Sequence, residues 1–178
     1  MDALIETERL TLRLIGPDDA DFVFDLYRRP EVARWSASRV PMTHRDEAVA
    51  RLGRWADRVA GRPGAGFFRV ALRDSGTPVG LALLVSLPAS AGVERDDMEI
   101  GWHFLPDSWG NGYATEAARA LIDRAFASGI PELYAVTHAD NARSQAVCRR
   151  LGMTDMGLRS DWYDQELRAF RLGGQRRE

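Results

Sequence analysis

One stretch, residues 98–126, constrains the fold of this chain more than any other. It reads as an apolar strand, then a loop rich in proline and glycine, then a run of good helix formers. A strand that passes through a glycine loop into a helix brings free backbone N–H groups and the positive end of the helix dipole to one point. The stretch therefore predicts an anion site, suited to phosphate groups, at the start of the helix.

The loop residues Gly110 to Ala114 are mostly small, so the main chain can approach an anion closely. The residues around the glycines indicate which class of phosphate ligand fits. A nucleotide-triphosphate loop needs a Gly-Lys-Ser/Thr ending. Here Tyr113 follows Gly112 and the chain has no lysine, so that class is excluded. A dinucleotide-binding fingerprint is weak too, because it needs three spaced glycines in the first βαβ unit. This loop comes late and has two glycines before Ala114.

The loop resembles the acetyl-CoA loop of the GCN5-related N-acetyltransferase (GNAT) superfamily. That family has the pattern Gln/Arg-x-x-Gly-x-Gly/Ala, which residues 109–114 match except that Trp109 replaces Gln or Arg. The run WGNGYATEA, residues 109–117, is similar to the branch that contains the ribosomal-protein N-terminal (alanine/serine) acetyltransferases. A second segment, residues 141–153, resembles the family's later Asn-x-x-Ser/Ala…Leu-Gly-Phe/Met block. With the opening TERLTLRLI, the resemblance spans nearly the whole chain.

The rest of the chain predicts strands and helices around this unit. Residues 4–15 read as one half-buried strand, because Leu10, Leu12 and Leu14 alternate with Thr11 and Arg13. Residues 66–73 and 77–87 read as a hairpin. Without a linker or an internal repeat, the 178 residues are expected to form a single GNAT domain, 1–178. The resemblance implies an α/β (α+β) fold, the GNAT acyl-CoA N-acyltransferase fold. Its central sheet is mixed and mostly antiparallel, with a splayed parallel pair and about four flanking helices.

Composition excludes several other classes of protein. A net charge of -2 gives no reason to expect nucleic-acid binding. The absence of lysine removes Schiff-base and pyridoxal chemistry, and a single cysteine removes an intramolecular disulfide. No secretory signal or bilayer-spanning apolar run is visible, so a cytoplasmic protein without membrane contact is expected. Dimers are common in the resembled family, so a homodimer is compatible with the resemblance.

The resemblance also implies where the co-substrate, acetyl-CoA, binds, and it implies no metal. The pantetheine arm would fill the gap in the splayed parallel pair like an added strand, while the glycine loop holds the pyrophosphate. Pro106 cannot extend the ladder, which fits a strand that ends there. The expected cofactor-binding residues are Trp102, His103, Phe104, Trp109, Gly110, Asn111, Gly112, Tyr113, Ala114, Thr115, Asn141 and Ser144.

Acetyl transfer to an amine also needs a base, because an alkyl ammonium has a pKa of about 10. Glu99 is the first candidate: it shares one strand face with Gly101 and His103, and the family often has a glutamate at this place. The alternative for Glu99 is a plain ion pair with an arginine. His138, at the exit of the next parallel strand, is the second candidate. Proton loss through water molecules needs neither residue.

The leaving thiolate needs an acid. The family commonly has a tyrosine seven residues after the asparagine of the second motif, where this chain has Cys148, a residue type that is usually structural when buried. The N-terminal-acetylating branch has a serine three residues after the asparagine, which is Ser144 here. We therefore expect Ser144 to hydrogen-bond the leaving sulfur and Asn141 to hold the pantetheine amides. Asn141 also reads as a simple helix N-cap.

The sequence thus predicts an acetyl-CoA-dependent N-acetyltransferase that moves the acetyl group directly to a primary amine, on a protein N-terminus or a small molecule. Trp35 and Arg39 lie in the segment 30–41, which in the family borders the acceptor pocket. A loop tryptophan is as often a packing residue. Two rival hypotheses remain: double displacement through Cys148, and a non-catalytic acetyl-CoA-binding or sensor module.

Overall fold

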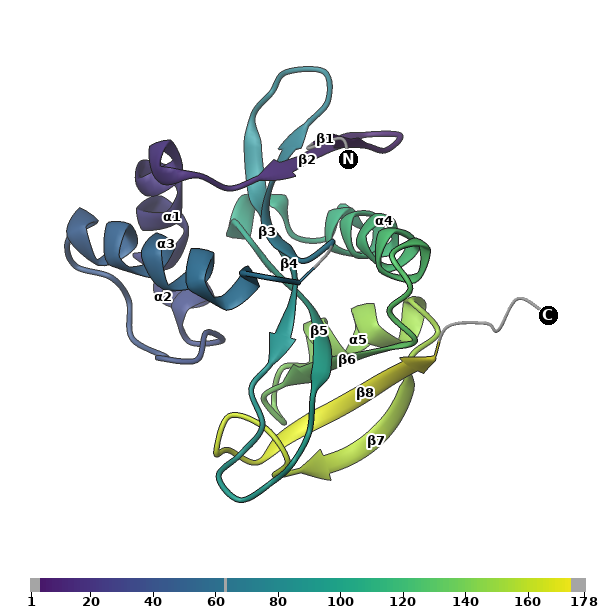
Figure 1. The fold of residues 1–178 in the computed structure, drawn as a ribbon. Coiled ribbons are helices and arrows are strands. Elements are labelled where there is room, and N and C mark those ends of the chain that lie inside the picture. The colour runs from purple at the N-terminus through teal and green to yellow at the C-terminus, as the bar shows by residue number, and fades with distance from the viewer. Residues whose placement is uncertain (1–3, 63, 174–178) are drawn as a thin grey trace.

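The computed structural model of the chain describes residues 4–62 and 64–173 (Figure 1). Residues 1–3, 63 and 174–178 belong to the expected domain range but lie outside the described residues. Eight strands form one sheet in the order β1-β2-β3-β4-β5-β6-β8-β7. The strands are β1 (Leu4–Glu6), β2 (Leu10–Leu14), β3 (Gly66–Leu72), β4 (Pro78–Leu87), β5 (Asp97–Phe104), β6 (Glu132–Thr137), β7 (Thr154–Arg159) and β8 (Leu167–Gly173).

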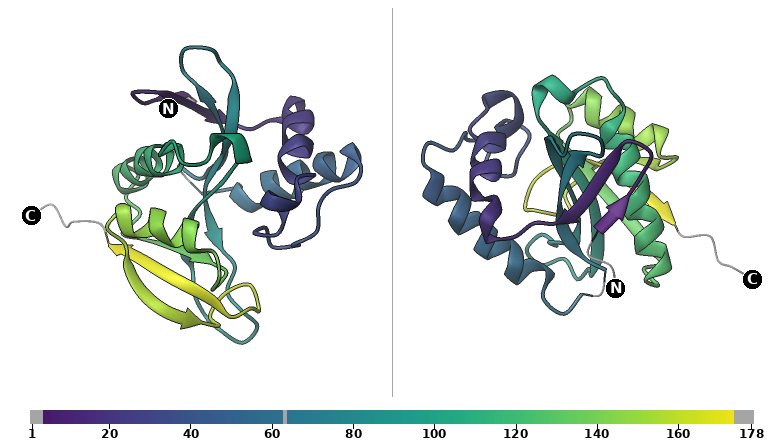
Figure 2. Two further views of the ribbon diagram at one scale, coloured as in Figure 1. Left: turned by 180° about the vertical axis from the view of Figure 1, so that it is seen from behind. Right: turned by 90° about the horizontal axis from the view of Figure 1, so that it is seen from above.

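Helices cover both faces of the sheet. The α-helices of the described part are α1 (Ala20–Tyr27), α2 (Pro30–Ala33), α3 (Arg45–Val59), α4 (Tyr113–Ala127) and α5 (Ala142–Arg150). Seen from above, α1, α2 and α3 lie on one side of the strands and α4 and α5 on the other (Figure 2). The structure confirms the mixed, mostly antiparallel fold, with α2 as a single extra turn. No helix within the described residues is long and apolar enough to cross a membrane.

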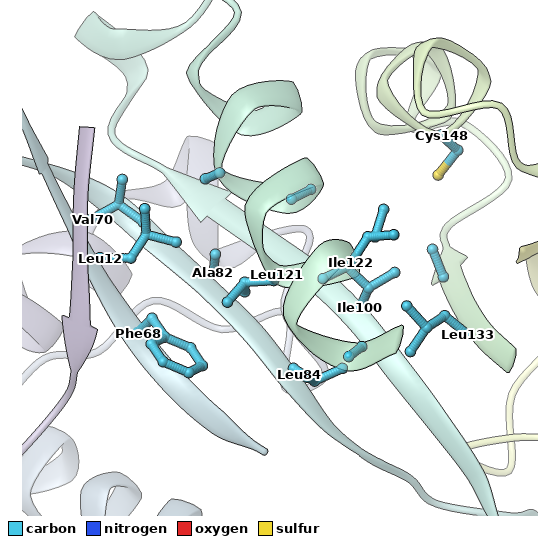
Figure 3. Close-up of a cluster of buried hydrophobic side chains, with 14 of the residues drawn as sticks. Leu12, Phe68, Val70, Ala82, Leu84, Ile100, Leu121, Ile122, Leu133 and Cys148 are labelled. Carbon is cyan, nitrogen blue, oxygen red and sulfur yellow. The ribbon is translucent and has the colours of Figure 1, made fainter. Parts of the chain in front are cut away.

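The central strand β4 is buried on both faces because its sequence is continuously apolar. Ala82 and Leu84 face α4, where they join a core with Leu121 of that helix (Figure 3). Leu81 and Leu83 face the opposite way and pack with the α1–α3 side. Two hydrophobic layers, one on each face, therefore fix β4 and the strands next to it.

The parallel pair is splayed, as expected. β5 pairs with β4 along its whole length, from Asp97 to Phe104. With β6, in contrast, it shares a single ladder position, Glu99 opposite Tyr134. Beyond Glu99 the two strands part, and among the described residues the main chain at the end of β5 has no strand partner on that side.

One expectation at the N-terminus is wrong in detail. Residues 4–15 are two antiparallel strands, β1 and β2, rather than one. The turn between them is closed locally, since the Thr7 N–H donates to the Leu10 carbonyl over 2.9 Å and the Leu10 N–H donates to the Thr7 hydroxyl over 3.0 Å. The alternation covers only Leu10 to Leu14, and the polar run from Glu6 to Arg9 lies at the turn between the two strands.

We predict that Leu121→Ala lowers the free energy of unfolding by about 2–5 kcal/mol, because it leaves a cavity between α4 and the sheet. Leu121 is 0% exposed, whereas Leu158 on the edge strand β7 is 50% exposed. Leu158→Ala is therefore the matched control, with a change within about 0.5 kcal/mol. Denaturant unfolding measures both; equal losses in the two variants would contradict the packing described.

Candidate functional site

The glycine loop before α4 has the backbone that an anion cradle requires. Gly110 and Gly112 have φ of 82° and 79°, a region that glycine adopts without strain. Gly112 is the N-cap of α4. A Cβ added at Gly110 would meet no atom within 4 Å, so the space in front of the loop is open.

The backbone N–H groups of this loop are not used by the protein. Within the described residues, those of Gly110 to Thr115 donate to no protein acceptor, and the first such bond at the helix start runs from the Glu116 N–H to the Gly112 carbonyl, 3.1 Å. The Thr115 hydroxyl is buried and also lacks a partner. Leaving a buried polar group without a hydrogen bond costs free energy, so such groups usually bind a ligand or a water molecule. These donors, at the positive end of α4, fit the diphosphate of a CoA molecule.

An unpredicted anchor holds the loop in place. Glu116 accepts hydrogen bonds from the Thr7 hydroxyl (2.6 Å), the Arg9 N–H (2.9 Å) and Arg9 Nε (2.7 Å). Arg9 Nη1 also donates to the Asn111 carbonyl over 2.9 Å. Although partial burial opposes it, these bonds lower the pKa of Glu116. These bonds connect the β1–β2 turn, residues 7–9, to the glycine loop and the first turn of α4, residues 111–116.

At the open end of β5, the main-chain groups of Trp102, His103 and Phe104 do not all point into the gap. The Leu105 N–H donates to the Val79 carbonyl, and the alternation of an antiparallel ladder then directs the His103 main chain toward β4. Trp102 and Phe104 direct theirs into the gap. The Phe104 carbonyl, however, already accepts the Trp109 indole N–H over 2.9 Å. Trp109 therefore braces the end of the strand.

Glu99 lies at the point where β5 and β6 part. Its side chain is buried, and its Oε2 accepts hydrogen bonds from Tyr163 Oη (2.5 Å) and Arg58 Nη2 (3.0 Å). Burial raises the pKa of Glu99, and Arg58 and Tyr163 only partly oppose this shift. Arg58 also donates to the Ser86 carbonyl and to Tyr163. The carboxylate is thus partnered by an arginine, but in the interior rather than at the surface.

A second pair lies on the same face of β5. The hydroxyl of Tyr27, from α1, is 2.6 Å from His103 Nδ1, and their rings meet edge to face. Burial lowers the pKa of His103 to about 4 and raises that of Tyr27 to about 12, so both are neutral near pH 7. Sequence periodicity assigns Tyr27 to the core, which is correct, but gives no sign of this contact.

The structure brings His138 and the expected acceptor residues together. The rings of Trp35 and His138 are 6.1 Å apart. Burial and the positive charge of Arg39 lower the pKa of His138. Arg39 itself has a φ of 55°, which is uncommon outside glycine. Segment 30–41 therefore lies against the end of β6.

The last helix places its expected residues in different surroundings. Asn141 is the N-cap of α5, and its Oδ1 accepts the Ser144 N–H over 3.2 Å. The hydroxyl of Ser144 has no hydrogen-bond partner within the described residues, and its side chain is half-buried. Cys148 points into the core with Ile122 (Figure 3), and burial raises the pKa of its thiol to about 12. Within the described residues no cluster of three or more His, Cys, Asp and Glu could hold a metal ion.

Comparisons with known proteins agree with this geometry. The model of the acetyltransferase (GNAT) domain matches residues 9–154. The FsC-acetyl coenzyme A-N(2)-transacetylase of Aspergillus fumigatus is 32% identical over 165 residues, 90% of this chain and 68% of that protein.

Solved structures have the same fold. An acetyltransferase from Agrobacterium tumefaciens str. C58 is similar with a TM-score of 0.77 at 26% identity, covering 98% of this chain and 96% of that one. A ribosomal L7/L12 alpha-N-protein acetyltransferase in complex with coenzyme A gives a TM-score of 0.76 at 15% identity, covering 96% and 97%. The family model spans most of the chain, and the chain therefore belongs to the GNAT family and is an N-acetyltransferase.

Proposed function

We propose that this protein transfers the acetyl group of acetyl-CoA directly to a primary amine, and that Glu99 is the general base. One observation carries the proposal. A row of unused amide donors, from Gly110 to Thr115, lies beside a parted pair of strands whose fork holds a buried carboxylate. The amides suit a diphosphate, the parted strands suit an extended arm, and the carboxylate suits a proton acceptor.

The residues around the gap fit the CoA part of the co-substrate. The loop amides and the orphan Thr115 hydroxyl would hold the diphosphate, and the main chain of Trp102 would pair with the pantetheine amides. The amide nitrogen of Asn141 has no partner within the described residues, so the residue can act as N-cap and pantetheine contact at once. The solved L7/L12 enzyme contains coenzyme A, which supports the same use of this fold here.

The chemical step needs a proton acceptor, an oxyanion donor and a group for the leaving sulfur. Glu99 has a raised pKa, which brings it closer to that of the amine, and its Oε1 accepts no hydrogen bond within the described residues. An N–H at the open end of β5 would stabilise the oxyanion. The Ser144 hydroxyl would then hydrogen-bond the sulfur. His138 is the weaker base, because its pKa is lowered.

The rival mechanisms have less support. A covalent acetyl-enzyme needs a thiolate, whereas Cys148 is 1% exposed and its pKa is raised to about 12. A pure sensor would need no buried carboxylate at the fork of the strands, where burial is costly. We therefore favour turnover by direct transfer. The acceptor is a primary amine on a protein N-terminus or on a small molecule.

We predict that Gly112→Asp weakens CoA binding more than about hundredfold, because a fixed negative charge would face the diphosphate. Gly112→Asn is the matched control: it has the same shape and tolerates positive φ equally well, but it is neutral. It should retain clearly more affinity than the aspartate variant. Calorimetric titration with CoA measures both, and thermal unfolding checks the fold. Equal CoA affinity in the wild type and Gly112→Asp would tell against the loop assignment.

We predict that Glu99→Gln lowers kcat about 100-fold or more while the KM for acetyl-CoA changes less than about twofold. The amide keeps the shape and the contacts with Arg58 and Tyr163 but cannot accept a proton. Thiol release from acetyl-CoA, measured with a panel of primary amines and short peptides, gives both constants. Unchanged turnover in this variant would remove Glu99 as the base. CoA binding without thiol release for every acceptor would instead favour a sensor.

The pH dependence provides a separate prediction. Activity should fall as the pH drops through the raised pKa of Glu99, because the carboxylate must be ionised to accept a proton. Arg58 lowers this pKa, so Arg58→Gln should raise it further and move the acid limb of the kcat profile to higher pH. Arg62→Gln, which breaks only the exposed ion pair with Asp96, is the control and should leave the limb in place. A limb that moves to lower pH in Arg58→Gln would contradict the assignment.

A further inference from the structure

The arginines of this chain differ in their partners. Most of those in the described part form ion pairs with carboxylates. Arg34, Arg39 and Arg51 have no carboxylate partner there. All three nevertheless lie next to the aromatic residues and histidines on the acceptor side of β5.

Contacts place these three arginines around one region. The guanidinium of Arg34 lies 4.4 Å over the ring of Trp35, which in turn is 6.1 Å from the ring of His138. The charge of Arg39 acts on the same histidine.

From the other side, the guanidinium of Arg51 lies 4.2 Å over the ring of Tyr27, whose hydroxyl binds His103. Burial and the charges of Arg51 and His138 lower the pKa of His103, whereas a hydrogen bond to the main chain of Trp35 opposes this shift. The two histidines thus connect the three guanidinium groups into one surface, which we call the arginine rim.

Few carboxylates offset the arginine rim. Glu99 is already held by Arg58 and Tyr163. Asp140 acts on His138 in the opposite sense to Arg39. Glu31, in the same segment as Arg34, forms no ion pair within the described residues. None of these carboxylates forms an ion pair with Arg34, Arg39 or Arg51 within the described residues, and Arg34 and Arg39 are exposed.

We propose that the acceptor carries a carboxylate, or another anionic group, close to its primary amine, and that Arg34, Arg39 and Arg51 bind that group. The proposal rests on the acetyl-transfer function above. Guanidinium groups pair with carboxylates through two parallel hydrogen bonds, and rings that hold the guanidinium in place reduce the entropy lost on binding. The same charges repel a polycationic amine, so they select against that class. The rim would hold the anion while the amine points toward Glu99.

Matched acceptors test this directly. Peptides that begin Ala-Asp-Asp, Ala-Asn-Asn and Ala-Lys-Lys present one α-amine with acidic, neutral and basic neighbours. Alanine and alaninamide, which differ in whether a carboxylate lies beside the amine, form the same comparison for small molecules. We expect kcat/KM for the acidic peptide or for alanine to exceed that of its neutral partner at least about tenfold, and added salt to reduce the difference. Whichever pair shows it identifies a protein N-terminus or a small amine as the source of the anion.

Variants connect the preference to the rim. The double variant Arg34→Gln, Arg39→Gln changes two exposed side chains, so the fold should persist. It should bring the ratio of kcat/KM for the acidic and neutral acceptors close to one. Arg54→Gln, an exposed arginine of α3 on the solvent side, is the control and should not change this ratio. Equal turnover of acidic and neutral acceptors, a preference for the lysine peptide, or an equal loss for all acceptors in the double variant would overturn the proposal alone. No thiol release with any acceptor would contradict the transfer function and this proposal with it.

Discussion

The arrangement of the candidate site depends on the point at which β5 and β6 stop pairing. The two strands share one ladder position, Glu99 opposite Tyr134, while β4 and β8 continue to hold them from either side. A sheet interior rarely leaves main-chain donors and acceptors without partners, because burying them unpaired is costly. The gap can persist because β5 packs against α4 through Met98, Ile100 and Phe104, and because its neighbour β4 is held from the other face by α1 and α3. A ligand that resembles a strand would supply the missing partners.

Two sets of long-range hydrogen bonds hold the segments around this gap. Glu116 connects the β1–β2 turn to the glycine loop before α4. The loop before β8 contacts the β4–β5 connection, since the Tyr163 N–H donates to the Pro88 carbonyl and the Ser90 N–H to the Asp161 carbonyl. Tyr163 is thereby fixed above Glu99, and Arg58 completes the shell. A buried carboxylate needs such partners to remain ionised, yet its raised pKa keeps it able to accept a proton.

Local patterns predict much of this molecule. Glycines at 110 and 112 before a run of helix formers predict the cradle and α4, and the unbroken apolar run of residues 78–85 predicts the central strand. The parted strands follow from the family resemblance rather than from any pattern. The sequence does not reveal contacts between distant segments, such as Thr7 with Glu116, Tyr163 with Glu99, or Tyr27 with His103. Each of these residues also has an ordinary local role, in a turn, a strand or a helix. The long-range contact is therefore visible only in the folded structure.

The proposed CoA site comprises the unused amides of the loop and the open end of β5. Amide NMR of the protein during a CoA titration tests this assignment. We expect the largest shifts, and new protection from hydrogen exchange, on the N–H groups of residues 110–115 and of Trp102. Shifts confined to other parts of the sheet, with these amides unchanged at saturating CoA, would contradict it.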